Sequence, residues 1–197
     1  MSKTVDYYFT PVSPWTYLGH ERFVALAKRH GASINVKPID LGRVFPVSGG
    51  LPLAKRAPQR QAYRLVELKR WSEFLGIPLN PKPKYFPAPA DEAVLAIIAA
   101  DSAGGPAAGL ALAGALLRAY WAEERDIADP AMIERIAAEC GVAAPGGEAR
   151  AAAKARFDAY TQEAIDLQVF GAPSYVYKGE IYWGQDRLDF LERALAK

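Results

Sequence analysis

The sequence predicts an α/β fold in which a long helical segment interrupts a small mixed sheet. Three observations lead to this fold class. A strand, a helix and a second strand follow one another within residues 5–39, which is the order of a βαβ unit. From Asp91 to about Gln168 only helical periodicity is present. From Val169 onward the chain returns to short β-rich runs and closes on a helix.

The βαβ unit begins with Val5 to Phe9, an aromatic and β-branched run typical of a strand. Ser13-Pro14 then predicts a helix start, because serine is a preferred N-cap and proline at the next position lacks an N–H that would otherwise be unpaired. This helix is expected to run to about His30 and to end at Gly31. Ser33 to Ile39 predicts a second strand, parallel to the first.

The middle of the chain is predicted to be a helical insertion. Asp40 to Pro58 is rich in glycine and proline and is expected to be a loop, and Pro81 to Pro89 is expected to be an irregular loop. The predicted helices are Gln59 to Leu75, Glu92 to Asp101, Ala107 to Glu123, Pro130 to Cys140 and Glu148 to Asp166. We therefore expect residues 59–168 to be inserted into a domain formed by 1–58 and 169–197.

The C-terminal segment combines a turn, a hairpin and a helix. Gly171-Ala172-Pro173 predicts the turn, Ser174 to Tyr177 and Glu180 to Trp183 predict strands joined by Lys178-Gly179, and Gly184-Gln185-Asp186 opens a helix with Leu188, Leu191 and Leu195 on one face. This order closes a thioredoxin-like domain, so the fold class is α/β and thioredoxin-like with an all-helical insertion. In that fold the proline is usually cis. Only about 5–6% of X–Pro bonds in folded proteins are cis, so this segment alone leaves a trans turn open.

Composition excludes several function classes. The chain has 197 residues and a net charge of +2 without a basic run, which gives no electrostatic case for nucleic acid or an anionic membrane. Residues 1–6 lack the apolar segment of a signal peptide, and the apolar tract around Ala107 to Leu117 is expected to be too short to span a bilayer, so a cytoplasmic location is the default. The single Cys140 excludes an internal disulfide, and with two histidines it leaves no predicted metal site.

Two predicted helix N-termini, at Ser13 and at Asp186, are candidates for anion binding. A helix N-terminus offers unpaired N–H groups and about half a positive charge, which stabilise thiolates and carboxylates. Redox members of the thioredoxin-like class carry Cys-x-x-Cys at the first position, but here the run is Ser13-Pro14-Trp15-Thr16. Disulfide chemistry is therefore excluded there, and any thiol must come from a ligand.

Three groups of motifs are spread over nearly the whole chain. They are Tyr8-Phe9-x-x-x-Ser13-Pro14-x-x-Tyr17-Leu18-Gly19, then Tyr63-x-x-x-x-Leu68-x-Arg70-Trp71 with Gly76-Ile77-Pro78-Leu79, and finally Gly171-Ala172-Pro173-Ser174, Gly179-Glu180 and Trp183-Gly184-Gln185-Asp186-Arg187. On these motifs the sequence resembles the 2-hydroxychromene-2-carboxylate isomerases, relatives of the kappa-class glutathione transferases and of the DsbA-like oxidoreductases. The resemblance implies a DsbA/kappa-class architecture and a homodimer.

The resemblance further implies that glutathione is the cofactor. Ser13 would donate its hydroxyl to the glutathione sulfur and, with the helix dipole, favour the thiolate over a thiol of pKa about 8.5. Ala172, before Pro173, would pair its backbone with the cysteinyl part, and Gln185 and Asp186 would hold the γ-glutamyl end through their backbone amides and the Asp186 carboxylate. The alternatives are a plain N-cap for Ser13 and a first-turn acid for Asp186, which is compatible with ligand binding.

Two positions depart from the family pattern. Arg60 stands in the region where kappa-class proteins carry a lysine expected to contact the glycyl end of glutathione, and Gly49-Gly50 replaces an asparagine usually found there. The remaining candidates are aromatic residues for a hydrophobic acceptor pocket, with core packing as the alternative for each: Trp15, Phe45, Trp71, Tyr85 and Phe86. Of these, Phe45, Tyr85 and Phe86 are the stronger candidates because they lie on expected loops.

The resemblance implies a glutathione-dependent isomerase that interconverts 2-hydroxychromene-2-carboxylate and trans-o-hydroxybenzylidenepyruvate-type aromatic compounds. The thiolate would add to a conjugated carbon of the small aromatic substrate, the adduct would rotate, and the thiolate would then be expelled. Two alternatives stay open: a kappa-type glutathione transferase or peroxidase at the same site, and a non-catalytic binding protein that keeps the thioredoxin fold.

Overall fold

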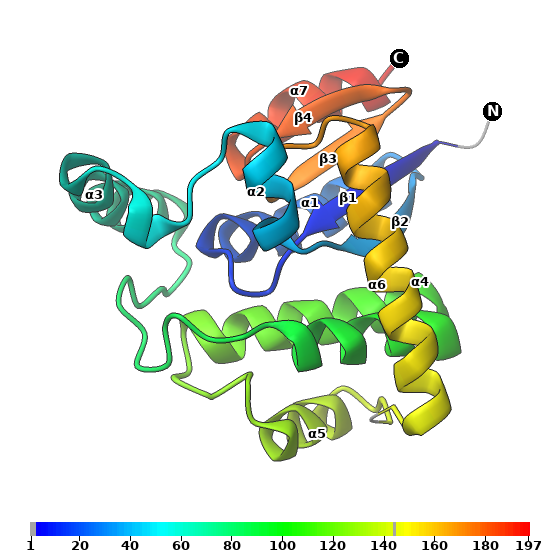
Figure 1. The fold of residues 1–197 in the computed structure, drawn as a ribbon. Helices are drawn as coiled ribbons and strands as arrows, with labels where there is room; N and C mark the ends of the chain where they lie inside the picture. The colour runs from blue at the N-terminus through cyan, green and yellow to red at the C-terminus, as the bar shows by residue number, and fades with distance from the viewer. Residues whose placement is uncertain (1–2, 144) are drawn as a thin grey trace.

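The computed structural model describes residues 3–143 and 145–197 and contains one mixed sheet (Figure 1). Its strands are β1 (Thr4–Phe9), β2 (Ser33–Pro38), β3 (Ser174–Tyr177) and β4 (Glu180–Trp183), in the order β2-β1-β3-β4. β1 and β2 run parallel, whereas β3 is antiparallel to β1 and β4 is antiparallel to β3. The two ends of the chain therefore share one sheet, as the sequence predicted.

The helices carry most of the remaining chain. They are α1 (Pro14–Arg29), α2 (Leu41–Ser48), α3 (Pro58–Leu75), α4 (Asp91–Trp121), α5 (Pro130–Glu139), α6 (Gly147–Asp166) and α7 (Leu188–Leu195), with short 3₁₀ turns η1 (Leu53–Lys55) and η2 (Gln185–Arg187). This order confirms an α/β fold with helices inserted between β2 and β3. The predicted break between α5 and α6 includes Ala144, which lies outside the described residues, as do Met1 and Ser2.

The sheet is covered on both faces because alternate side chains of a strand point to opposite sides. On one face, Tyr7 belongs to the largest apolar cluster, together with side chains of α1, α4, α5 and α7. On the other face, Tyr8 and Val176 pack with Val44 of α2 and Ala164 of α6. Leu188, Leu191 and Leu195 are all buried in the first cluster, which confirms the apolar face predicted for the last helix.

Local sequence signals set the ends of several elements. Ser13 is the N-cap of α1 in an extended conformation, and its Oγ accepts a hydrogen bond from Thr16 N at 3.2 Å. The β3–β4 connection is the predicted two-residue turn, with φ of 53° at Lys178 and 81° at Gly179. Positive φ at both central residues is the geometry of a type I′ turn, whose twist matches that of the flanking strands.

The prediction of a continuous loop over Asp40 to Pro58 is wrong, because Leu41–Ser48 forms α2. Asp40 caps this helix by accepting a hydrogen bond from Gly42 N at 2.7 Å, and Gly49 ends it at φ 75°. Phe45 therefore lies on a helix and not on a loop. The glycine that suggested a loop is a helix stop, since a left-handed residue after the last turn is a common C-terminal cap.

The apolar segment predicted as two helices forms α4, which is kinked at Gly105 (φ 76°, ψ −179°). The two arms meet closely, since a Cβ on Gly109 would lie 2.8 Å from the Cβ of Asp101. By length and composition α4 could cross a bilayer, which differs from the sequence expectation. Half of its most apolar window is buried inside the protein, and its side chains contribute to the main core, as in the central helix of a globular domain.

Candidate functional site

The N-terminus of α1 and the turn before β3 meet at one point. The Ala172–Pro173 peptide bond is cis, as the fold class predicted. Ser13 Oγ donates a hydrogen bond to the carbonyl oxygen of Ala172 at 3.3 Å, while it accepts one from Thr16 N. Ser13 is therefore an N-cap, as the alternative for this residue held, and its hydroxyl hydrogen is directed at the cis-proline turn.

The turn before η2 joins the same assembly. Gly184 N donates a hydrogen bond to the carbonyl oxygen of Pro173 at 2.9 Å, which places Gln185 and Asp186 directly after a residue bonded to the cis-proline turn. Gly184 has φ 105°, a conformation that a residue with a Cβ adopts rarely. The structure therefore brings together Ser13, Ala172, Pro173, Gln185 and Asp186, which the sequence had selected from opposite ends of the chain.

This assembly presents unused backbone donors. Among the residues that the structure describes, no acceptor is bonded to the N–H of Ala172, Gln185 or Asp186. Unpaired N–H groups at the start of a helical turn favour carboxylates, because these groups carry a partial positive charge. Asp186 is exposed, and its carboxylate lies 3.5 Å from Arg187. The assembly therefore has the donors and the carboxylate that an amino-acid end of a ligand requires.

The Gln185 side chain has a structural role that sequence reasoning missed. It is buried, and its Oε1 accepts a hydrogen bond from Arg22 at 2.6 Å. Gly19 permits the close approach of α1 to η2, since a Cβ at that position would lie 2.8 Å from Gln185 Cβ. The Gln185 backbone is thereby held against α1, while its side chain points away from any ligand on the exposed side. The sequence motif that contains Gln185 gave no indication of this side-chain role.

Arg60 lies on α3, whereas Gly50 lies in the segment that follows α2. Arg60 is exposed on the first turn of α3. Gly50 packs against Phe45, because a Cβ at Gly50 would lie 2.3 Å from the Phe45 ring. The glycine at position 50 thus makes room for an aromatic side chain of α2, which gives a physical reason for this departure from the family pattern.

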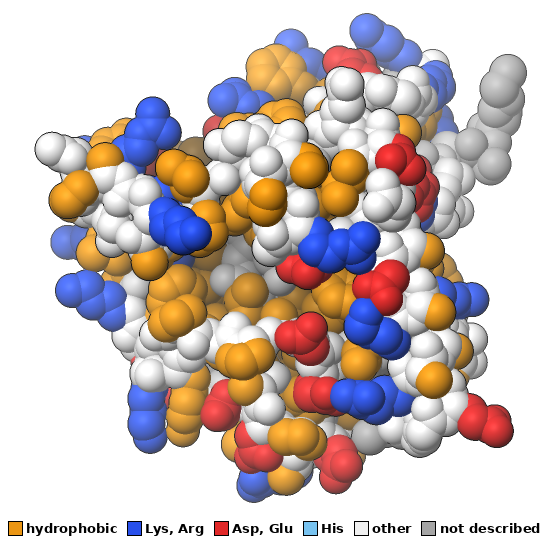
Figure 2. Space-filling model, viewed as in Figure 1, with side chains coloured by type: hydrophobic (Ala, Val, Ile, Leu, Met, Phe, Trp, Pro, Cys, Tyr) orange, Lys and Arg blue, Asp and Glu red, His pale blue; other side chains and the backbone are white. Residues whose placement is uncertain are grey.

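The aromatic candidates are all half-buried and fall into four environments, of which Phe45 on α2 is the one described above. Trp15 is in the first turn of α1, and Trp71 makes an edge contact with the exposed Phe74 on α3, with ring centroids 5.7 Å apart. Tyr85 and Phe86 lie on the loop before α4, and the Phe86 ring is 5.6 Å from that of Trp121. Figure 2 shows a hollow bounded by α2, α3 and α4, with hydrophobic side chains gathered around it.

His20 and Cys140, the other candidates for acid–base or thiol chemistry, are packed within the protein and lie outside this assembly. His20 is buried between Tyr7 Oη, at 3.2 Å from Nδ1, and the carbonyl oxygen of Leu110, at 3.0 Å from Nε2. Burial lowers its pKa, so it is neutral near pH 7. Cys140 is the C-cap of α5, and burial raises its pKa, which disfavours the thiolate. Over residues 3–143 and 145–197, no group of three or more His, Cys, Asp or Glu side chains is arranged to hold a metal ion.

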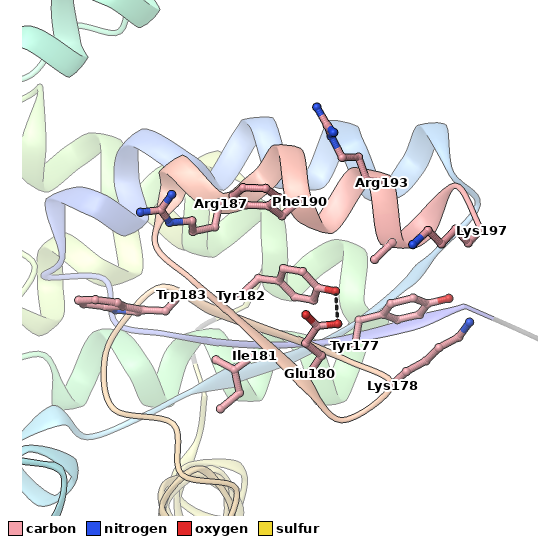
Figure 3. A pocket seen from close by; sticks show the side chains of 11 residues that line it. Tyr177, Lys178, Glu180, Ile181, Tyr182, Trp183, Arg187, Phe190, Arg193 and Lys197 are labelled. Atoms are coloured by element: carbon pink, nitrogen blue, oxygen red, sulfur yellow. Dashed lines mark hydrogen bonds between the residues drawn. The ribbon is translucent and has the colours of Figure 1, made fainter.

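A separate cavity of about 630 Å³ lies between α7 and the β3–β4 hairpin (Figure 3). Tyr182 points into it and donates a hydrogen bond to Glu180 at 2.7 Å. The basic side chains of its lining are Lys178, Arg187, Arg193 and Lys197. Neither Ser13 nor Ala172 lines this cavity, so it is distinct from the assembly around the cis-proline turn.

Comparison with known proteins identifies the class and then the family. Residues 4–196 match the family model of the DSBA-like thioredoxin domain, and the chain belongs to this family. The 2-hydroxychromene-2-carboxylate isomerase of Pseudomonas putida is 32% identical to this chain, over 98% of this chain and 94% of its own length. A solved structure of a 2-hydroxychromene-2-carboxylate isomerase has a TM-score of 0.80 at 30% identity, covering 98% of this chain and 94% of its own.

The chain therefore belongs with the 2-hydroxychromene-2-carboxylate isomerases, and the resemblance seen in the sequence is confirmed. A shorter match is to glutathione S-transferase kappa 1 of Caenorhabditis elegans, at 37% identity over 82 residues, which is 41% of this chain and 36% of that protein. The P. putida protein and the solved isomerase structure are matched over nearly their full length, whereas the kappa-class match is partial.

Proposed function

We propose that this protein is a glutathione-dependent isomerase that interconverts 2-hydroxychromene-2-carboxylate and trans-o-hydroxybenzylidenepyruvate-type aromatic compounds. The names of its relatives support the reaction class. The observation that carries the proposal is the hydrogen bond from Ser13 Oγ to the Ala172 carbonyl oxygen, 3.3 Å long, which joins the N-terminus of α1 to the cis-proline turn.

The residues at this assembly fit glutathione. The free N–H of Ala172 and its carbonyl oxygen would pair with the peptide backbone of the cysteinyl residue. The free N–H groups of Gln185 and Asp186 would bind the γ-glutamyl carboxylate, and the Asp186 carboxylate would bind the ammonium group. Arg60, exposed on α3, would meet the glycyl end. The kappa-class relative supports the choice of glutathione, since its name is that of a glutathione transferase.

Ser13 would control the state of the sulfur. When bound, glutathione supplies a thiolate that adds reversibly to a conjugated carbon of the acceptor and leaves unchanged. The Ser13 hydroxyl has one hydrogen, which is now given to the Ala172 carbonyl oxygen. When the cysteinyl N–H of glutathione donates to the Ala172 carbonyl oxygen, the Ser13 hydroxyl hydrogen would be free to turn toward the sulfur. Ser13 Oγ would still accept the hydrogen bond from Thr16 N. Together with the positive end of α1, this hydrogen bond would lower the pKa of the thiol.

A kappa-type glutathione transferase is the second candidate, and the match to the C. elegans protein favours it. Net consumption of glutathione with a generic electrophile would distinguish it from an isomerase, which returns the glutathione. We also propose, from the same family likeness, a cytoplasmic homodimer, and the division of the chain at residues 58/59 and 168/169 stays a prediction.

The test is glutathione binding by calorimetry, together with the ultraviolet thiolate absorbance of the bound ligand, on the natural protein and on Ser13→Ala. Asp129→Ala is the matched control, because Asp129 caps α5 through a hydrogen bond from Ala131 N at 3.0 Å and is no part of the assembly. Each variant loses a cap worth about 1 kcal/mol of stability. We expect only Ser13→Ala to lose the thiolate signal.

The contrary results are distinct. No binding at millimolar glutathione would contradict both the isomerase and the transferase and leave a thioredoxin-fold binding protein. A thiolate signal of unchanged size in Ser13→Ala would reduce Ser13 to its capping role.

A further inference from the structure

Arg64 on α3 is a cation that rests on two aromatic rings. Its guanidinium carbon lies 5.4 Å from the centroid of the Phe86 ring and 5.8 Å from that of the Trp121 ring. Both distances are within the range in which the face of an aromatic ring attracts a cation. The guanidinium is therefore held against two tilted aromatic rings, one of them on the loop that the sequence had marked as a candidate acceptor pocket.

This cation has no acidic partner in the described part of the chain. The ion pairs found there do not include Arg64. Glu67, one helical turn away, is hydrogen-bonded to Arg70 at 2.8 Å instead. Partial burial, together with the nearby charge of Arg56, lowers the pKa of Arg64 to about 10. A partly desolvated cation without a counter-ion is costly to a protein, and an anionic ligand removes that cost.

A second donor next to Arg64 is also unused. The indole N–H of Trp121 is fully buried and has no acceptor among the described residues. Buried donors are nearly always paired in folded proteins, so an unpaired one needs an explanation. An anion with acceptor oxygen atoms is a fitting partner for the guanidinium, and oxygen acceptors are also what an indole N–H binds.

The position of α3 relates Arg64 to the proposed active site. Tyr17, one helical turn after Ser13, donates a hydrogen bond to the carbonyl oxygen of Pro78 at 2.7 Å, so the segment that ends α3 is tied to the start of α1. The hollow in Figure 2 lies between α2, α3 and α4, the elements that carry Phe45, Arg64 and Trp121.

We propose that Arg64, seated on Phe86 and Trp121, binds the carboxylate of a conjugated aromatic acid and thereby selects acidic acceptors over neutral ones. The proposal rests on the proposed function for the identity of the acceptor. Guanidinium binds carboxylate through two parallel hydrogen bonds, and the half-buried Phe86 ring would contact the flat conjugated part of the same ligand. The same carboxylate chemistry is offered by the glycyl end of glutathione, so the experiment separates the two sources.

The probes are trans-benzylidenepyruvate and trans-benzylideneacetone, which share one conjugated scaffold and differ by a carboxylate in place of a methyl group. Their binding is measured by calorimetry without glutathione, so that no addition occurs. The variants are Arg64→Gln and Arg64→Lys, and Lys69→Gln is the control, because it removes a charge from an exposed position of the same helix.

We expect Arg64→Gln to weaken benzylidenepyruvate binding by roughly 10- to 100-fold, the equivalent of a lost charged hydrogen bond, and to leave benzylideneacetone unchanged. Arg64→Lys keeps the charge but not the planar fork, so an intermediate loss is expected. Lys69→Gln should bind both probes as the natural protein does. If isomerase activity is absent while this pattern holds, the proposed function fails and the carboxylate site stands.

Three results would overturn the site. The first is natural protein that does not prefer benzylidenepyruvate. The second is an equal loss for both probes, which would mean that Arg64 only supports the fold. In the third, a separate calorimetric titration shows that glutathione binds Arg64→Gln more weakly than the natural protein, while benzylidenepyruvate binding is unchanged. The glycyl carboxylate of glutathione is then the ligand of Arg64.

Discussion

Replacing Gly19 by alanine tests whether α1 positions the proposed glutathione site through contact with η2. The added Cβ would lie 2.8 Å from Gln185 Cβ, 3.0 Å from the Tyr175 hydroxyl and 3.4 Å from Gln185 Cα. Neither neighbour yields easily, because a Cβ moves only with its backbone and Tyr175 is fully buried and stacked 5.4 Å from Tyr7. The substitution therefore pushes on the turn that carries Gln185 and Asp186.

The sign of the stability change decides the argument. Alanine in a helix interior is favoured over glycine by about 1 kcal/mol. Overpacking a tight contact costs about 1–3 kcal/mol, and a contact against backbone-linked atoms belongs in the upper part of that range. The net expectation is that Gly19→Ala lowers the free energy of unfolding by about 1–2 kcal/mol. If the turn shifts as expected, glutathione binding weakens by roughly tenfold, or about 1.4 kcal/mol.

Urea unfolding measures the first quantity and calorimetry the second. The matched control is Gly147→Ala at the start of α6, where an added Cβ would meet no atom within 4 Å. We expect this control to be as stable as the natural protein or slightly more so, with the same affinity for glutathione. A Gly19→Ala protein at least as stable as the natural one would refute the claim that the α1–η2 contact is tight.

Two further predictions concern the scaffold. Lys37 is ion-paired to Glu163 at 2.7 Å and to Asp6 at 3.0 Å; burial opposes its charge, but the hydrogen bonds to these carboxylates outweigh burial and raise its pKa. A raised pKa adds stability below the unfolded value near 10.4 that is lost as pH rises through the folded value, so urea titrations should show a steeper fall in stability above about pH 10 for the natural protein than for Lys37→Met. In the same assay Leu191→Ala, at a fully buried position, should lower the free energy of unfolding by about 2–5 kcal/mol. Phe190→Ala, at the neighbouring position where the side chain is 53% exposed, should change it by no more than about 0.5 kcal/mol. Equal losses of stability would contradict the assignment of the buried face of α7.

The two ends of the chain could be predicted well because their signals are local. Ser13-Pro14 predicts a helix start from two adjacent residues, and Lys178-Gly179 predicts a two-residue turn. The structure has both, together with strands at Ser174–Tyr177 and Glu180–Trp183 as predicted. The middle was harder, because glycine and proline occur at the ends of helices as well as in loops. That ambiguity hid α2, whereas the break predicted between Asp101 and Ala107 coincides with the non-helical Gly105, where α4 is kinked.

The candidate site divides in the same way. Ser13, Ala172 and Asp186 each belong to a motif that predicts a local backbone geometry, a helix start or a turn. They could therefore be selected from the sequence before their contacts in the fold were known. Arg64 belongs to no such motif, and Glu67 three residues later has the spacing of an ordinary helical ion pair. Only the fold shows that Glu67 is bonded to Arg70, and that the loop before α4 and the last residue of α4 place Phe86 and Trp121 beneath the guanidinium. Arg64 is a candidate because it has no acidic partner among the described residues, and the absence of a partner can be recognised only once the structure shows where the neighbouring acidic side chains are bound.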